Sequence, residues 1–263
     1  MDKKLGTLGH WRGGAQGRTG RRWARKAVVG MVCGAAAAGT LVVQSTPAGA
    51  IVPGPNGQIA FESSRSGDTD ISVMGPNGST QINLTADSPG LDVFPAWSPD
   101  GTKITFSSSR HNPPGLPFPN LDVFVMNADG SGVTQLTDSP GEDRGTSWTS
   151  DGQTIVFHSA RDRDATHTFD IFKMNADGSN ETKIFTNGSA AYVCGDSTNG
   201  IIVFNSSGDP LGTNPANGIN PTTGLPIRDF EIFTMNMNGG DVFQVTNNTV
   251  IDSGPKWSPD CSM

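Results

Sequence analysis

The chain has 263 residues, of which 34 are Gly, 18 are Pro and only 16% are charged. This length fits one all-β domain, and the apolar residues recur in short regular runs, which argues against a disordered chain. Residues 1–50 hold eight of the 18 basic residues but one of the 25 acidic residues, so residues 51–263 carry a net charge of −14. Nucleic acid is therefore not expected as a partner, because an acidic body repels phosphate backbones.

Residues 1–50 have the layout of an export leader. A basic stretch ending in residues 21–26 precedes the apolar residues 27–43, and the small residues 47–50 follow. This order predicts a secretory signal peptide that is removed after residue 50, leaving residues 51–263 without a stable membrane span. A retained anchor is the alternative, but the apolar stretch is short and rich in Ala and Gly. The pair Arg21-Arg22 points to the twin-arginine route, and we expect a secreted or periplasmic protein.

Four copies of one composite pattern fill the rest of the chain. Each copy has an Ile-x-Phe block, a block opened by an acidic residue, a Gly-containing turn, a short block ending in Thr, and a Trp block. The Ile-x-Phe blocks start at Ile59, Ile104, Ile155 and Ile202, and the acidic residues are Asp70, Asp122, Asp170 and Glu231. The Trp blocks contain Trp97, Trp148 and Trp257, and residues 192–196 stand in the place of the Trp block in the third copy.

The copies recur every 45 to 51 residues, which is the spacing of a four-stranded propeller blade. Their blocks are alternating and rich in β-branched and aromatic residues, so each predicts a strand. The Asn-Gly and Asp-Gly pairs between them supply the positive φ that a hairpin turn needs. The sequence therefore predicts an all-β fold, a β-propeller of about four four-stranded blades.

The pattern resembles the WD40-like (PD40) repeat of the TolB-like propellers over residues 55–263. The resemblance rests on Trp-Ser-Pro-Asp-Gly at Trp97, Ile-x-Phe-x-Ser-x-Arg at Ile104 and Asp-Ile-Phe-x-Met-Asn-x-Asp-Gly at Asp170. It implies that the Trp strand is innermost (A), followed outwards by the Phe strand (B), the acidic strand (C) and the Thr strand (D). It also implies an Arg–Asp link across each B–C hairpin, which pairs Arg65, Arg110 and Arg161 with Asp70, Asp122 and Asp170.

The two ends of the repeat array have complementary phases. The array begins just before a B strand near residue 57 and ends just after the A strand of Trp257. The C-terminal A strand would thus complete the first blade and close a ring, while an incomplete propeller from a truncated gene is the alternative. Cys194 and Cys261 would lie on neighbouring inner strands, and we hypothesise a disulfide that pins the closure, with two free thiols as the alternative.

The connections of variable length, B–C and D–A, fall on one face of the predicted propeller. Function concentrates on such loops, so we expect a partner on this face. The candidate binding residues are His111, Phe118, Asp162, Asp164, His167 and Arg228. Three of them, Asp162, Asp164 and His167, are close enough in sequence to contribute to a metal site, but a solvated loop is the preferred interpretation, and neither a metal nor a cofactor is expected.

The chain contains no Gly-x-Ser-x-Gly elbow and no His-Glu-x-x-His motif. We therefore expect a non-catalytic module that binds a protein or a glycan of the cell envelope or extracellular space. A propeller-type hydrolase or lyase, or a fragment of a longer propeller, are the alternatives. The Trp residues are expected in the core between blades, with sugar stacking as their alternative role.

Overall fold

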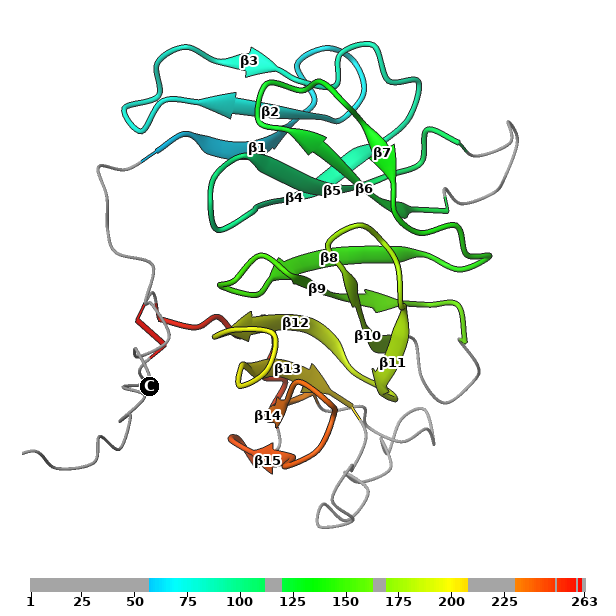
Figure 1. Ribbon diagram of the computed structural model, residues 1–263, viewed down its shortest axis with the longest axis vertical. Coiled ribbons are helices and arrows are strands. Elements are labelled where there is room, and N and C mark those ends of the chain that lie inside the picture. Colours follow the sequence, from blue (N-terminus) through cyan, green and yellow to red (C-terminus); the bar gives the residue numbers. More distant parts are fainter. Residues whose placement is uncertain are drawn as a thin grey trace, which may run out of the picture. The chain divides into compact units, whose positions relative to one another are not determined.

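A computed structural model describes residues 57–111, 120–162, 169–207, 230–248, 250–258 and 260–261, all within one compact unit, Ser45–Met263. These residues form four antiparallel sheets that follow one another in chain order (Figure 1). No helix that could span a membrane occurs in these ranges.

The first sheet comprises β1 (Ile59–Ser63), β2 (Asp70–Met74) and β3 (Ile82–Asn83). The second comprises β4 (Asp92–Trp97), β5 (Lys103–Ser108), β6 (Asp122–Asn127) and β7 (Thr134–Gln135). The third comprises β8 (Asp143–Trp148), β9 (Thr154–Ser159), β10 (Asp170–Asn175) and β11 (Thr182–Phe185), and the fourth β12 (Ser189–Cys194), β13 (Ile201–Ser206), β14 (Glu231–Asn236) and β15 (Phe243–Gln244).

The four sheets are propeller blades with the predicted strand order, so the expectation of an all-β propeller of about four blades is confirmed. In the second blade β4 pairs with β5, β5 with β6 and β6 with β7, and the third and fourth blades repeat this order. The inner strands β1, β4, β8 and β12 lie next to one another in sequence order. The D strands are short, from two to four residues, whereas the A, B and C strands have five or six residues.

The inner turns are held by contacts between near neighbours in the chain. The Ser98 hydroxyl donates to Asp100 Oδ1 at 2.6 Å, and the Thr149 hydroxyl donates to Asp151 Oδ1 at the same distance. The turn glycines Gly101 and Gly152 have φ values of 70° and 67°, in the left-handed region that favours glycine. The predicted Asp-Gly hairpin turns are thus present.

The hydrophobic core consists of layers between consecutive blades. The layer between the first and second blades contains Ile71 and Val73 from one side and Ile104, Phe106 and Met126 from the other. The two further junctions use equivalent positions, with Val123 facing Ile155 and Phe157, and Val156 and Ile171 facing Ile202 and Phe204. Each blade therefore has an N-side face towards the preceding blade and a C-side face towards the following one, and strand alternation assigns side chains to the two faces.

Trp97 and Trp148 pack against the first and second of these layers, which confirms the expected place of these two residues between blades. The fourth blade lacks an equivalent Trp. The pairing Val193 with Ile202 matches Trp97 with Ile104 and Trp148 with Ile155, so Val193 rather than Tyr192 takes the Trp position. Tyr192 lies one residue earlier on the strand.

The prediction of an Arg–Asp link across each B–C hairpin is wrong. Arg110 binds Asp92 at 3.1 Å and Arg161 binds Asp143 at 2.8 Å, so the Arg residues reach the first residue of the A strand and not that of the C strand. Strand pairing does not decide between the two acids, because Asp92 and Asp122 both lie opposite Ser108. The physical reason is that the Asp122 carboxylate is bound by the Gln135 side-chain amide and the Ser139 backbone N–H. The residue Arg65 binds Gln81 instead.

The C-terminal segment lies on the fourth blade. The Trp257 indole N–H donates to the Tyr192 carbonyl at 3.0 Å, and Cys261 forms a disulfide with Cys194, with a Cα–Cα distance of 5.8 Å. The hypothesised disulfide is therefore present, but it joins this segment to β12 and does not bring it to β1. The described strands give the first blade only β1, β2 and β3, which corresponds to the incomplete propeller.

Candidate functional site: a cavity between the inner strands

A cavity of 660 Å³ lies between the inner strands. Its lining comes from all four blades and from the C-terminal segment, and includes Phe61, Phe94, Trp97, Trp148, Tyr192 and Lys256. The volume falls within the range of about 300–1,000 Å³ that is usual for ligand pockets. Aromatic rings supply large, rigid contact surfaces to such a site.

Phe94 is placed at the cavity by a bulge in β4. The pairing of β4 with β5 shifts between Val93 and Ala96, and Phe94 has a φ of 56°. Equivalent bulges place Gly145 and Ala190 at φ values of 65° and 49°. Phe94 is 42% exposed, so a large apolar ring lies open to solvent at the cavity.

A charged and aromatic cluster adjoins Phe94. The Arg144 guanidinium lies 4.5 Å from the Phe169 ring centroid and 5.6 Å from that of Phe94, and it forms an ion pair with Glu142 at 2.8 Å. Arg144 Nε–H donates to His158 Nε2 at 3.3 Å. Burial, with a contribution from the Arg144 charge, lowers the pKa of His158 to about 3, so this imidazole is neutral and its charge does not change near neutral pH.

Trp97 differs from Trp148 and Trp257 in the hydrogen bonding of its indole N–H. The Trp148 indole N–H donates to Thr105 Oγ1 at 3.1 Å, and that of Trp257 donates to a backbone carbonyl. Trp97 Nε1 is buried without a partner among the described residues. Strand pairing places Ala60 in β1 where β5 has Thr105, so the acceptor hydroxyl is missing.

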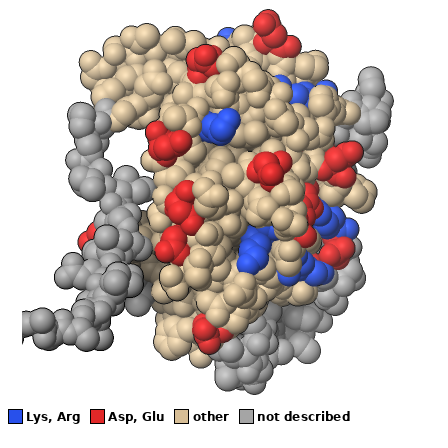
Figure 2. Space-filling model, in the orientation of Figure 1, with Lys and Arg blue, Asp and Glu red and all other residues tan. Residues whose placement is uncertain are grey.

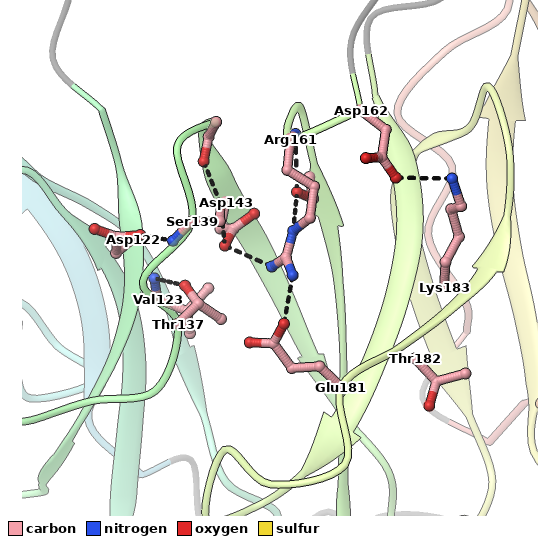
Figure 3. Close-up of polar contacts among 12 residues, drawn as sticks. Asp122, Val123, Thr137, Ser139, Asp143, Arg161, Asp162, Glu181, Thr182 and Lys183 are labelled. Atoms are coloured by element: carbon pink, nitrogen blue, oxygen red, sulfur yellow. Dashed lines mark hydrogen bonds and ion pairs between the residues drawn. The ribbon is translucent and has the colours of Figure 1, made fainter.

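The ends of the blades on the loop side carry a network of acids, of which Asp122 and Asp143 are buried. In Figure 3, Arg161 bridges Asp143 and Glu181, while Lys183 binds Asp162 at 2.8 Å. The pKa of Asp143 is raised because it is buried, although Arg161 and neighbouring hydroxyls oppose this effect. Burial also raises the pKa of Asp122 to about 6, against the effect of the Ser139 backbone N–H.

The acids that open the C strands hold the D strands in place. Val123 N–H donates to Thr137 Oγ1 at 2.9 Å and Ile71 N–H to Thr85 Oγ1 at 3.0 Å. Thr85 Oγ1 in turn donates to Asp70 at 3.3 Å, and the Thr246 hydroxyl donates to Glu231. In the first and fourth blades the recurring acid and Thr are thus structural partners.

Two of the six candidate binding residues lie in the described ranges, and both have partners within the chain. His111 Nδ1 is 2.7 Å from Gln135 Oε1, and its ring packs edge-on against Phe124. Asp162 forms the ion pair with Lys183. The other candidates, Phe118, Asp164, His167 and Arg228, lie outside the described residues. In the described ranges no three His, Cys, Asp or Glu side chains are grouped as metal ligands.

Three residues of this region were not predicted from the sequence: Phe94 and Tyr192, which line the cavity, and Arg144, which lies beside Phe94. Their signal is faint, because each stands at a position that differs between copies: Phe94 aligns with Gly145 and Ala190 in the bulge. Residues that differ between otherwise similar copies are candidates for function, whereas the shared residues maintain the blade.

Comparison with known proteins supports the reading of the repeats. No family model matches the chain. A TolB homologue of Chlorobium luteolum is 39% identical over 80 residues, which is 30% of this chain and 16% of that protein. The structure of a TolB from Agrobacterium tumefaciens superimposes with a TM-score of 0.54 at 24% identity, covering 77% of this chain and 67% of the other. The chain has the fold of a TolB-like β-propeller.

TolB-like propellers share this fold with enzymes. Hydrazine synthase of Kuenenia stuttgartiensis superimposes with a TM-score of 0.52 at 16% identity, covering 73% of this chain and 32% of that one. The tricorn protease superimposes with a TM-score of 0.53 at 10% identity, over 73% and 21% of the two chains. At these identities only the fold is shared, so function has to be argued from the site.

Proposed function

We propose that this TolB-like propeller is an exported binding module that takes a segment of a protein partner of the cell envelope into the cavity between its inner strands. The observation that carries the proposal is the aromatic lining of the cavity by four blades, with Phe94 exposed at a bulge. Binding energy in protein complexes concentrates in buried aromatic and Arg anchors. The neighbouring Arg144 adds such a group beside Phe94.

Export is part of the proposal. It is supported by the basic, apolar and small-residue zones of residues 1–50 and by the disulfide, which suits an oxidising compartment. The net charge of −14 on residues 51–263 does not suit a polyanionic partner. Figure 2 shows acidic side chains spread over one face, with Lys and Arg side chains interspersed among them.

The test compares two variants with similarly exposed apolar residues. Phe94→Asn removes the ring at the cavity, and Asn tolerates the positive φ of this position. Ile82→Asn is the control, since Ile82 is 46% exposed and does not line the cavity. Envelope proteins retained by the wild-type chain are purified, and their Kd is measured for each variant.

We expect Phe94→Asn to weaken binding by about tenfold or more, the effect of losing roughly 1.4 kcal/mol, while Ile82→Asn binds as the wild type does. Equal binding by both variants would exclude the cavity as the site. A glycan is the competing ligand class. It would be indicated if oligosaccharides quench the Trp fluorescence of the wild type but not that of a Trp148→Phe variant.

A further inference from the structure

The two end blades expose faces that are buried at every internal junction. Ile59 on the N-side face of the first blade is 42% exposed, whereas its equivalents Ile104, Ile155 and Ile202 are 0% exposed. On the C-side face of the fourth blade, Val245 is 46% exposed, whereas its equivalents Leu84 and Leu136 are only partly exposed and pack on the internal junctions. In the internal junctions an N-side face always packs on a C-side face, so the two end faces are complementary.

In the described part of the chain, β1 is an edge strand whose inner side is not paired with another strand. Ser98 N–H donates to the Lys103 carbonyl at 2.9 Å, so Lys103, and by alternation Thr105, turn their backbone groups towards β4. The equivalent residue in β1 is Ala60, and among the described strands none lies on that side of β1. The unpartnered Trp97 Nε1 lies beside the same position.

The C-terminal segment on the fourth blade has the position of an A strand. The Trp257 indole bonds to the carbonyl of Tyr192, the residue that pairs with Val203. Trp148 makes the equivalent approach to Thr105, the residue that pairs with Ala96. The C-terminal segment thus lies against the fourth blade as an A strand lies against the blade before it. It lacks B, C and D strands in the described part of the chain, while the first blade has these three and lacks A.

We propose that a second copy of this chain occupies the fourth blade's C-side face, so that the Trp257 segment of each copy serves as the A strand of the other copy's first blade. The exchange covers Ile59 and Val245 and gives every blade two neighbours. A two-fold axis relates the copies, and the two junctions are alike. A packed junction does not bend continuously, and the substantial contacts between the described strands all lie within one blade or between consecutive blades, which favours a second copy over closure within one chain.

The experiment uses the full chain and single substitutions at exposed positions that leave each blade intact. Ile59→Asp places a charge on the first blade's end face and Val245→Asp on the fourth blade's end face. Ile82→Asp, at the rim of an internal junction with a similar exposure, is the control. Circular dichroism confirms that each variant is folded, and sedimentation velocity with native mass spectrometry measures the oligomer.

We expect the wild type and Ile82→Asp to be dimers, and each end-face variant alone to be a monomer. A mixture of Ile59→Asp and Val245→Asp chains should regain a heterodimer, because one junction in the mixed pair is free of both substitutions. A wild type that is monomeric at all concentrations would overturn the proposal. So would an Ile59→Asp dimer, or a mixture without heterodimer. These outcomes are independent of the partner-binding test at Phe94.

Discussion

Arg161 Nη2 binds Asp143 Oδ2 at 2.8 Å, so the end of β9 is joined to the start of β8 in the same blade. Arg110 and Asp92 form the same link one blade earlier. The Asp143 side chain is fully buried and that of Arg161 is 19% exposed, so the pair is largely removed from water. Breaking it leaves Glu181 as the remaining carboxylate partner of the Arg161 guanidinium.

We expect Asp143→Asn to lower the free energy of unfolding by about 2 kcal/mol, less than the usual cost of breaking a buried ion pair, because Arg161 keeps its contact with Glu181. Asp162→Asn is the matched control, since it removes the exposed ion pair with Lys183 and should cost about 0.5 kcal/mol. Urea unfolding followed by Trp fluorescence measures both. Equal losses in the two variants would show that the Arg161 link is not a stabilising contact.

The unpartnered Trp97 indole predicts a stabilising substitution. Ala60→Thr restores the hydroxyl that Thr105 offers to Trp148, and should raise the free energy of unfolding by about 1 kcal/mol. Ala60→Val has the same shape without the hydroxyl and should give no such gain. The difference between Thr and Val at position 60 in thermal unfolding, measured at low protein concentration, is the decisive quantity. A difference near zero would mean that Trp97 Nε1 already has an acceptor.

His158 predicts a pH dependence of stability. Its pKa is lowered from 6.5 to about 3 in the folded chain, mainly by burial, so between these values the unfolded chain takes up a proton that the folded chain does not. Stability therefore falls as the pH falls from 6.5 towards 3, by up to roughly 1.4 kcal/mol per pH unit.

His158→Gln keeps an acceptor for Arg144 Nε–H and does not titrate, so its stability should fall less steeply over this window. Asp122 contributes a pH dependence of the opposite sign, but it is present in both the wild type and His158→Gln, so its contribution cancels when the two are compared. The pKa of Asp122 is raised from 3.8 to about 6 by burial, so this acid stabilises the fold less as the pH rises through that interval. Denaturant unfolding at several pH values gives both slopes. Parallel curves for the wild type and His158→Gln would refute the assignment.

The disulfide predicts the behaviour of the C-terminal segment. It closes a loop across 67 residues, so replacing both Cys194 and Cys261 with Ser should cost about 4 kcal/mol by the chain-entropy estimate. The wild type should show this loss on addition of a reductant, and the double variant should be insensitive to it. Intact mass under non-reducing conditions checks that the bond has formed. Wild-type stability that is unaffected by reductant would contradict the prediction.

The repeat made the blades predictable, because strand, turn and core positions are all local or adjacent-blade properties. Ile104 and Phe106 were identifiable as core residues from alternation alone, and the Cys194–Cys261 disulfide from the phase of the inner strands. The partner of Arg161 was not predictable, since Asp143 and Asp170 both lie opposite Ser159. They differ in their side-chain partners, because Asp170 is bound by Lys183 and the Asn187 backbone N–H. The cavity was also not predicted, because the recurring bulge carries Phe94 in only one of three blades, where the others have Gly145 and Ala190.

The Ser98–Asp100 and Thr149–Asp151 turns have a consequence for the history of such chains. Each turn is completed by atoms two residues apart, so a newly duplicated blade needs no distant partner to form its central hairpin. Its acid–Thr clamp is likewise internal to the blade. Duplication or deletion of one unit then changes the number of blades without changing how any of them folds. What a change of copy number does alter is which end faces are left uncovered, so the count of units sets the way in which the array assembles.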